Sequence, residues 1–287
     1  MKRLTVVALV IVSVFSLCPA YAATINTGRA DVELVVPEGY SKDSPAPLVM
    51  LLHGYTSSGA GQESYMKFGE LVDEYGFLLL MPDGTREERD SKNQFWNATD
   101  ACCNFQGSDV DDSGYLQGLI DEVKKQYSID ANRVYLIGHS NGGFMSHRMA
   151  YDHPDTIAAI ASLAGASLPD MKGASPKRPV NILQIHGTND KTISYDGGTI
   201  GTSSYPSATE TVELWAAYNG IGVENKKRAR KKLDLDRRPE GKETTITRYD
   251  KKGSVELWTI QDGGHIPGIT KDFSRNVIEW LMAHPKE

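Results

Sequence analysis

Short apolar runs alternate with amphipathic segments along most of the chain. The apolar runs have the length of buried strands, and the segments between them repeat apolar residues at helical spacing. This alternation is typical of an α/β protein with a mostly parallel, twisted sheet and helices on both faces. We predict strands at residues 32–36, which read as an early edge strand, and at 48–52, 77–81, 134–138, 157–163, 180–186 and 255–260.

Helical spacing is clearest at residues 113–127, where Asp111, Asp112 or Ser113 can serve as the N-cap. Two further helical segments are predicted at residues 213–218 and 273–282. The sequence has no internal repeat and no linker that would divide it. We therefore expect residues 23–287 to form a single domain.

The first residues follow a different pattern. Lys2 and Arg3 precede an apolar run at residues 4–17, and Ala20-Tyr21-Ala22 then supplies small residues at cleavage spacing. The run has about 14 residues against the roughly 20 that span a bilayer, so we predict a signal peptide at residues 1–22 rather than a retained anchor. Lipid attachment at Cys18 is a minor alternative, because Leu17 precedes it. The mature protein is expected to be secreted or periplasmic.

Charge narrows the choice of partners. The 287 residues carry a formal net charge of −6, and loss of the leader removes two basic residues and no acidic one. A surface of this sign does not attract nucleic acid globally. Residues 225–242 are an exception, because they include a basic run from Lys226 to Lys232. Such a run can bind anions, but in an acidic protein we favour a solvated peripheral loop.

Cleavage of the leader would leave Cys102 and Cys103, which are adjacent. In an oxidising compartment we expect them to form a disulfide with each other, and two free thiols are the alternative. A trans peptide bond would hold their Cα atoms about 3.8 Å apart, below the usual range of about 4.4–6.8 Å. On that geometry the bridge would be strained and comparatively reducible.

Ser140 lies in the pentapeptide Gly138-His139-Ser140-Asn141-Gly142, between a β-rich run and an apolar helical pattern. A nucleophile elbow needs small residues on both flanks, because its turn is sharp. The pentapeptide alone is only moderately specific, and its position between a predicted strand and a predicted helix strengthens it. We predict that Ser140 is a catalytic nucleophile.

A serine nucleophile needs a histidine base, and the base needs a carboxylate partner. In chain order the acid and the base should follow two later strands. Asp190 follows the strand at 180–186, and His265 follows the last strand. Asp196 and Asp262 are the rival acids, whereas His186, His147, His153 and His284 fit the base position less well.

The tetrahedral oxyanion needs hydrogen-bond donors. The main-chain N–H of Asn141, next after the nucleophile, is one candidate. The second should come from the glycine-containing loop at residues 53–59, where we choose the N–H of Tyr55, with Thr56 as the alternative.

These motifs resemble those of the α/β-hydrolase superfamily, and within it the polyhydroxybutyrate depolymerase and feruloyl esterase family of exported bacterial esterases. The resemblance covers nearly the whole mature chain and implies the nucleophile, acid, base and oxyanion roles given above. The matching segments are 52–54, 76–84, Trp96 with Cys102 and Cys103, 110–115, 138–143, 186–190 and 263–268.

The chain also departs from similar enzymes. These often have a cysteine where this chain has Tyr55, further cysteines near Asn219, and a tryptophan where it has Ile266, a change that alters the wall of the acyl pocket. Trp96 and Phe95 are candidate substrate contacts, with packing beneath a loop as the alternative.

We therefore predict an exported serine esterase that acts on polyester or polyhydroxyalkanoate oligomers or on feruloyl-type esters. A serine peptidase of the same fold is the alternative, and a catalytically inactive binding module is a third class. The sequence shows no metal-ligand cluster or cofactor fingerprint, so we expect neither a metal nor a cofactor. Ester substrate is the only expected partner, with no nucleic acid and no stable membrane anchor.

Overall fold

In a computed structural model of the protein, the described residues are 21–171, 178–250 and 254–286. Most of the predicted leader, including Cys18, lies outside these ranges. Tyr21 and Ala22 form the beginning of the first strand, so the predicted cleavage point after Ala22 falls inside that strand. The leader and its cleavage remain predictions. Within the described ranges, no helix has the length and apolar character needed to cross a bilayer.

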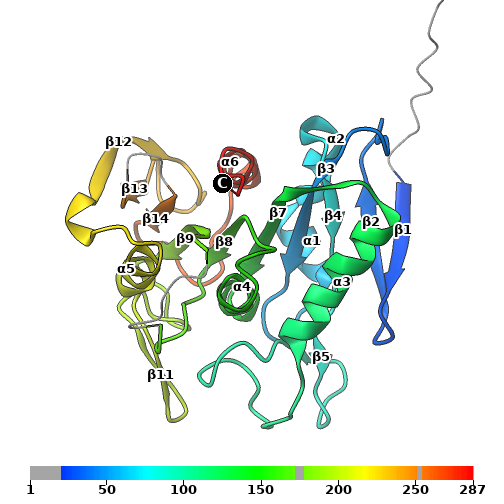
Figure 1. Ribbon diagram of the computed structural model, residues 1–287. Helices are drawn as coiled ribbons and strands as arrows, with labels where there is room; N and C mark the ends of the chain where they lie inside the picture. Colours follow the sequence, from blue (N-terminus) through cyan, green and yellow to red (C-terminus); the bar gives the residue numbers. More distant parts are fainter. Residues whose placement is uncertain (1–20, 172–177, 251–253, 287) are drawn as a thin grey trace, which may run out of the picture.

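A ten-stranded sheet is the centre of the fold (Figure 1). Its six middle strands are parallel, and two antiparallel strands extend it at each end. In spatial order the strands are β1 (Tyr21–Asn26), β2 (Asp31–Val36), β4 (Leu78–Leu80), β3 (Ala46–Leu52), β7 (Ile129–His139), β8 (Ala159–Leu163), β9 (Asn181–Gly187), β14 (Val255–Ile260), β13 (Thr244–Arg248) and β12 (Lys227–Leu233).

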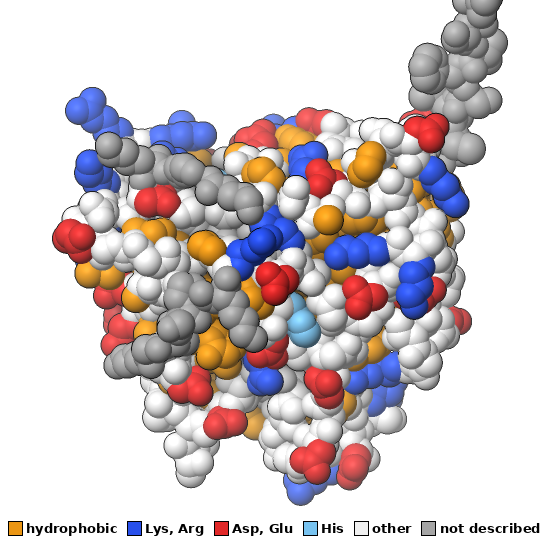
Figure 2. All heavy atoms as spheres, viewed as in Figure 1, with side chains coloured by type: hydrophobic (Ala, Val, Ile, Leu, Met, Phe, Trp, Pro, Cys, Tyr) orange, Lys and Arg blue, Asp and Glu red, His pale blue; other side chains and the backbone are white. Residues whose placement is uncertain are grey.

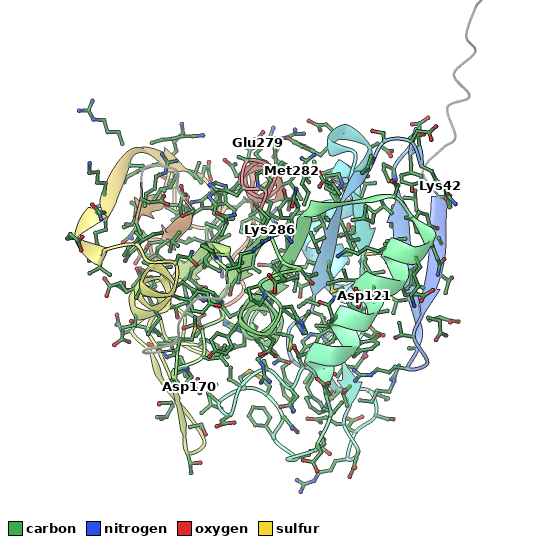
Figure 3. All side chains as sticks on the ribbon, viewed as in Figure 1. Lys42, Asp121, Asp170, Glu279, Met282 and Lys286 are labelled. Carbon is green, nitrogen blue, oxygen red and sulfur yellow. A yellow bond between two sulfur atoms is a disulfide. The ribbon has the colours of Figure 1, made fainter. Side chains whose placement is uncertain are left out.

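Helices cover both faces of this sheet. On one face, α3, α4 and α5 pack against one cluster of buried residues; on the other, α1, α2 and α6 lie against a second cluster. Strand β3 shows the division, because Leu48 and Met50 belong to the first cluster and Val49 and Leu51 to the second. Figure 3 shows side chains filling both layers. The helices are α1 (Gly59–Met66), α2 (Val72–Tyr75), α3 (Asp112–Gln126), α4 (Asn141–Asp152), α5 (Ala208–Tyr218) and α6 (Lys271–Met282), with short 3-10 turns at Phe68–Leu71 and Val223–Asn225.

Local sequence explains where the main helices begin. The side chain of Asp111 accepts a hydrogen bond from the Gly114 N–H and caps α3, which selects one of the three predicted caps. Ser207 and Glu210 form a capping box at the start of α5. Thr270 caps α6 through the Asp272 N–H.

Two short hairpins complete the fold. Both lie at the lower side of the view in Figure 1, β11 to the left and β5 to the right. The hairpins are β5 (Thr85–Arg86) with β6 (Gln94–Phe95), and β10 (Gly198–Ile200) with β11 (Ser203–Tyr205).

All of the predicted strands are present, and the predicted α/β architecture is confirmed. Two assignments need correction. Residues 32–36 are not at the edge, because β1 pairs outside β2. The basic run is not a loop, because it forms β12 and pairs with β13. Lys and Arg side chains stand out at the corner of the molecule where Figure 1 places β12 (Figure 2).

Candidate active site

Ser140 lies on the sharp turn between β7 and α4. Its φ of 53° and ψ of −120° lie outside the regions that L-residues favour, and its N–H donates to the Leu163 carbonyl (2.8 Å). The flanking positions must be glycine, because a Cβ at either one would collide with nearby backbone atoms. A Cβ at Gly138 would lie 2.0 Å from the Gly142 carbonyl oxygen, and one at Gly142 would lie 2.2 Å from the Leu52 carbonyl oxygen. The turn therefore fits only the small residues that the elbow motif predicts.

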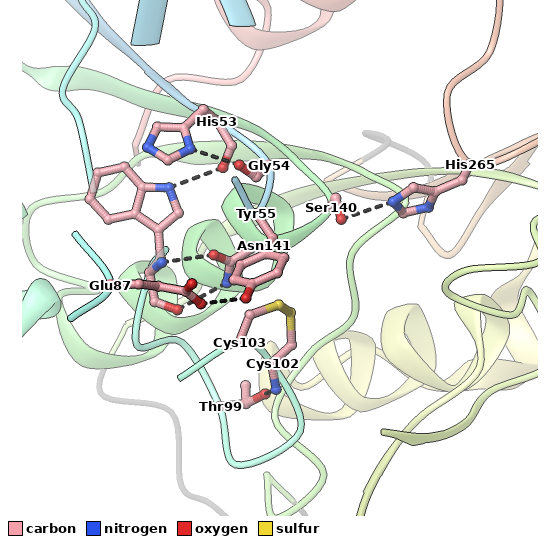
Figure 4. The surroundings of a disulfide bond; sticks show 11 residues. His53, Gly54, Tyr55, Glu87, Thr99, Cys102, Cys103, Ser140, Asn141 and His265 are labelled. Carbon is pink, nitrogen blue, oxygen red and sulfur yellow. Dashed lines mark hydrogen bonds between the residues drawn. A yellow bond between two sulfur atoms is a disulfide. The ribbon is translucent and has the colours of Figure 1, made fainter. Parts of the chain in front are cut away.

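Three predicted side chains form one hydrogen-bonded chain. The Ser140 Oγ lies 2.9 Å from His265 Nε2, and His265 Nδ1 lies 2.8 Å from Asp190 Oδ2. The three residues follow β7, β14 and β9, whose carboxyl ends meet at one edge of the sheet. Figure 4 shows the contact between Ser140 and His265. The arrangement is that of a nucleophile, a base and an orienting carboxylate.

Asp190 is held in place from several directions. Its Oδ1 accepts the N–H groups of Thr192 (2.8 Å) and Ile193 (2.9 Å). Its Oδ2 lies 3.4 Å from His186 Nε2, in addition to the contact with His265. Burial alone would raise the pKa of Asp190, but the hydrogen bonds from His186 and His265 outweigh burial and hold the pKa well below its ordinary value. Asp190 is therefore a carboxylate at neutral pH.

The rival acids lie elsewhere. Asp196 and Asp262 are exposed, and in the described part of the chain neither contacts His265. Asp262 instead donates its N–H to the Thr188 hydroxyl (2.9 Å). Of the acids considered, Asp190 is the one that reaches the histidine.

A buried polar chain extends behind Asp190. His186 Nε2 donates to the Ile193 carbonyl (2.9 Å), and its Nδ1 lies 3.2 Å from the side-chain amide of Gln184. The Gln184 carbonyl oxygen in turn lies 2.9 Å from His147 Nε2, and His147 Nδ1 accepts from the Trp215 indole (2.9 Å). Burial lowers the pKa of His147 to about 4, so His147 is uncharged at neutral pH. These hydrogen bonds hold the side chain of His186, which contacts Asp190.

The predicted oxyanion loop lies against the elbow. A Cβ at Gly54 would lie 3.5 Å from the Ser140 Cβ, so the loop passes directly beside the nucleophile. The Thr56 N–H is already bound to the Gln94 carbonyl (2.8 Å), which removes the alternative donor. Among the described residues, the N–H groups of Tyr55 and Asn141 have no acceptor. Both predicted donors are therefore free to bind an oxyanion.

His53 fixes the peptide that carries the Tyr55 donor. Its Nε2 accepts from the Gly84 N–H (2.9 Å), so its Nδ1 carries the proton and donates to the Gly54 carbonyl (2.8 Å). The Gly54 carbonyl and the Tyr55 N–H belong to the same planar peptide unit. Burial lowers the pKa of His53, which favours this neutral form. Because His53 holds the Gly54 carbonyl, it also sets the direction of the Tyr55 N–H.

Trp96 and Phe95 are not substrate contacts. Trp96 is completely buried and Phe95 is 2% exposed, so neither presents a surface to a ligand. The Trp96 indole donates to the His53 carbonyl (3.0 Å), and its main chain makes two hydrogen bonds with the Asn141 side chain (2.7 and 2.9 Å; Figure 4). This prediction is corrected in favour of the packing alternative, because both side chains are buried.

Cys102 and Cys103 are joined by a disulfide in the same loop (Figure 4). The peptide bond between them is cis, so the trans geometry assumed from the sequence is wrong. Their Cα atoms lie 3.0 Å apart, which is the separation that a cis peptide gives. Both residues are buried.

The loop that carries His265 has its own supports. His139 Nε2 donates to the His265 carbonyl (2.9 Å), and burial lowers the pKa of His139 to about 4. The uncharged ring, 5.1 Å from that of His265, does not oppose a positive charge there. On the other side of the loop, the buried carboxylate of Asp236 accepts hydrogen bonds from the Gly268 N–H (2.9 Å) and the Arg238 guanidinium (2.9 Å). The same guanidinium also donates to the Ile266 carbonyl (2.9 Å).

Two exposed apolar side chains lie next to residues of the site. Ile266 and Phe105 are 61% and 57% exposed, and the Phe105 ring lies 5.2 Å from the Tyr55 ring. The Tyr55 hydroxyl donates to Glu87, which raises the pKa of the phenol to about 12 together with burial, the larger cause. Phe105 and Glu87 could not be found from the sequence, because both lie in an irregular loop without periodicity.

The supporting residues His53, His139, Asp236 and Arg238 were also not assigned roles from the sequence. His53 and His139 carry a recognisable signal, since each directly precedes or follows a motif glycine. Asp236 and Arg238 carry none, because they come from a charged segment far along the chain. In the described ranges, no group of three or more His, Cys, Asp or Glu side chains could hold a metal ion.

The fold and the site define an α/β-hydrolase. The acetyl xylan esterase from Aspergillus awamori has the same fold, with a TM-score of 0.62 and 16% identity over 92% of this chain and 99% of that one. The phospholipase/carboxylesterase family model matches residues 35–221. The chain belongs to this family, which places it among the carboxylic ester hydrolases.

Several relatives are named for ester hydrolysis. The chain is 27% identical to NocK of Nocardia uniformis subsp. tsuyamanensis, a protein assigned as an esterase, over 85% of this chain and 70% of that one. It is 28% identical to feruloyl esterase B of Piromyces equi and 26% to poly(3-hydroxyalkanoate) depolymerase C of Paucimonas lemoignei, over 82% and 73% of this chain. These matches span only 42% and 53% of the two longer relatives. The resemblance stated from the motifs is confirmed.

Proposed function

We propose that the protein hydrolyses carboxylic esters through a covalent acyl-enzyme on Ser140. His265 takes the Ser140 proton as the Oγ attacks the ester carbonyl, and then gives it to the departing alcohol. The same histidine next deprotonates a water molecule, whose oxygen attacks the acyl carbonyl. The bond between the acyl carbon and the Ser140 Oγ then breaks, and His265 returns the proton to the Oγ as the acid leaves. The observation that carries the proposal is the hydrogen-bonded chain from Ser140 through His265 to Asp190, with distances of 2.9 and 2.8 Å.

The roles of the other residues follow from charge. Asp190 stays ionised, holds the His265 ring in one tautomer and stabilises the imidazolium. The N–H groups of Tyr55 and Asn141 bind the oxyanion of the tetrahedral intermediates. The Gly54 peptide, fixed by His53, needs no reorganisation when that charge develops.

We further propose that the substrate is a feruloyl- or acetyl-type ester on a polymer, or a polyhydroxyalkanoate or related polyester oligomer. The names of the feruloyl esterase and the depolymerase support two of these classes. The acetyl class is supported by a bifunctional acetylxylan esterase/xylanase of Neocallimastix patriciarum, to which the chain is 32% identical over 61% of this chain and 23% of that one. The exposed apolar side chains of Phe105 and Ile266 beside the site suit an acyl group. The leader pattern and the disulfide support export of the protein to the compartment in which such polymers occur.

A panel of soluble esters tests the proposal. It should include short-chain chromogenic acyl esters, methyl ferulate, hydroxybutyrate oligomers and a peptide anilide, each measured with the wild-type protein and with Ser140→Ala. We expect turnover of at least one ester, none of the anilide, and a loss of kcat by about 10⁴-fold or more in the variant. Faster turnover of the anilide than of every ester would favour the peptidase alternative.

A further inference from the structure

The edge strand β12 carries a concentration of positive charge that the proposed chemistry does not use. Five of its seven residues are basic, and the strand contains no acidic residue. The whole chain, in contrast, carries a net charge of −6. The five residues are Lys227, Arg228, Arg230, Lys231 and Lys232, and all five are exposed.

These cations differ from the basic residues next to them. Lys226 pairs with Glu213 (3.2 Å), and Arg248 on β13 pairs with Glu256 (2.6 Å). In the described part of the chain, none of the five basic residues of β12 forms an ion pair. Figure 2 shows Lys and Arg side chains projecting at this corner, and Figure 3 shows long side chains directed outward from the β12 ribbon. The charge is therefore free to meet an external anion.

The shape of β12 suits a linear polymer. As the outermost strand of the sheet, it has one side without a strand partner in the described part of the chain, where main-chain N–H and C=O groups are available to sugar hydroxyls. Seven residues of strand extend over about 23 Å. Its two apolar residues, Ala229 and Leu233, pack against the core, so the exposed groups of the strand are all basic.

Two other classes of polyanion fit less well. Surfaces that bind membranes combine cations with exposed apolar side chains, and surfaces that bind single-stranded nucleic acid add aromatic rings. Strand β12 exposes neither. Charge with hydrogen-bonding edge groups matches a polysaccharide that carries carboxylates.

The strand also leads toward the active site. Its last residue, Leu233, pairs with Thr244, which pairs in turn with Ile260 at the end of β14, just before the His265 loop. The segment that follows β12 then binds that loop through Asp236 and Arg238 (2.9 Å contacts to Gly268 and Ile266). Five strand spacings of about 4.8 Å, or roughly 24 Å, separate β12 from the strand that carries Ser140. A small ester cannot span that distance, whereas a polymer can.

We propose that β12 is a docking strand for an acidic polysaccharide whose ester groups are the substrate. The inference rests on the proposed esterase function and names the carrier of the ester. Uronate carboxylates along the polymer bind the free cations of β12, and the same chain continues toward Ser140. Binding at β12 should therefore raise the efficiency on polymer-borne esters and leave small esters unaffected.

The test measures binding and turnover separately. Binding of Ser140→Ala protein to polygalacturonate is measured by affinity electrophoresis or calorimetry, with neutral xylan, duplex DNA and anionic phosphatidylserine vesicles in parallel. The docking variant is R228Q/R230Q/K232Q. The matched control is K42Q/K124Q/K125Q, which removes three positive charges from the other end of the molecule, where Figure 3 places Lys42.

We expect salt-sensitive binding to polygalacturonate that falls at least about tenfold in the docking variant and stays within about twofold in the control. Without the Ser140 substitution, the docking variant should hydrolyse a small ester at the wild-type rate, which also shows that it folds. Unchanged polysaccharide binding in the docking variant would overturn the proposal, as would equal or tighter binding to DNA or vesicles.

A different role for the β12 lysines would give a different experimental result. Lysines on an edge strand also prevent two sheets from pairing edge to edge. If that is their purpose, the docking variant will self-associate while its polysaccharide binding is unchanged, and the docking proposal fails. Failure of the esterase proposal is distinguished by the wild-type protein, which would then show no turnover of small esters.

Discussion

At the scale of single residues, we expect the proposed oxyanion donor, the N–H of Tyr55, to depend on the side chain of His53. His53 holds the Gly54 carbonyl and so directs the N–H of Tyr55. We expect His53→Ala to lower kcat by about 10²–10³-fold, the usual cost of losing one oxyanion donor, with a much smaller change in KM. His53→Asn, whose amide can still donate to Gly54, should recover part of the loss. Steady-state kinetics of both variants check this, and equal losses in the two would contradict the positioning role.

The acid supports a second prediction at this scale. Asp190→Asn should keep the fold but lose the charge that orients and stabilises protonated His265, so kcat should fall by up to about 10⁴-fold. The neighbouring His186→Leu removes one of the hydrogen bonds that keep the pKa of Asp190 low. It should lower kcat less and shift the acid limb of the kcat profile to higher pH. Asp196→Asn, on the same loop, is the control and should behave as wild type.

Single residues also show how far the sequence could predict the site. Chain order alone located Asp190 and His265, because the carboxyl ends of parallel strands meet at one edge of the sheet. Chain order gives no information on Trp96, and an aromatic residue in a loop has no periodicity to tell burial from exposure, so substrate contact and packing both stayed open. The burial of Trp96 depends on contacts with Asn141 and His53, residues more than forty positions away along the chain.

At the scale of elements, the strand-to-helix turn at Ser140 tolerates no added methyl group. A Cβ at Gly138 would strike the backbone of Gly142 at 2.0 Å, so we expect Gly138→Ala to abolish activity and reduce soluble expression. Gly118, in the middle of α3, is the matched control, because a Cβ there meets nothing within 4 Å. Gly118→Ala should raise the free energy of unfolding by about 0.5–1 kcal/mol. Urea unfolding and ester turnover check both, and an active Gly138→Ala would contradict the account.

Elements were predicted well where burial on both faces gives an unbroken apolar run, as in β3 and β4. Strand β12 was not predicted as a strand, because its residues Lys227 to Lys232 have the composition of a solvated loop. Pairing with β13 and the burial of Leu233 define that strand, and neither is visible from local sequence. The outer position of β1 was missed because its residues overlap the predicted cleavage site.

At the scale of the whole molecule, buried histidines set the response to acid. His139 and His147 have pKa values of about 4 in the fold against 6.5 when exposed, because burial disfavours their charged forms. Between those values the unfolded chain binds more protons than the folded one, so the free energy of unfolding should fall as the pH drops from 6.5 toward 4. The expected loss is on the order of a few kcal/mol.

Urea unfolding at several pH values measures this slope. His147→Gln can keep contacts with Gln184 and Trp215 and should flatten the slope between pH 6.5 and 4. The lowered pKa of Asp190 adds a further loss only below its ordinary value of 3.8. A free energy of unfolding that rises as the pH falls from 6.5 to 4 would contradict these assignments.

The central claim concerns the whole molecule as a catalyst, namely that turnover passes through an acyl group on Ser140. Rapid quenching of the protein with a chromogenic ester, followed by intact mass measurement and peptide mapping, tests this most directly. We predict a burst of about one equivalent of the alcohol and an acyl adduct on the peptide that contains Ser140, both absent in Ser140→Ala. An adduct on another residue, or wild-type turnover by Ser140→Ala, would contradict the claim.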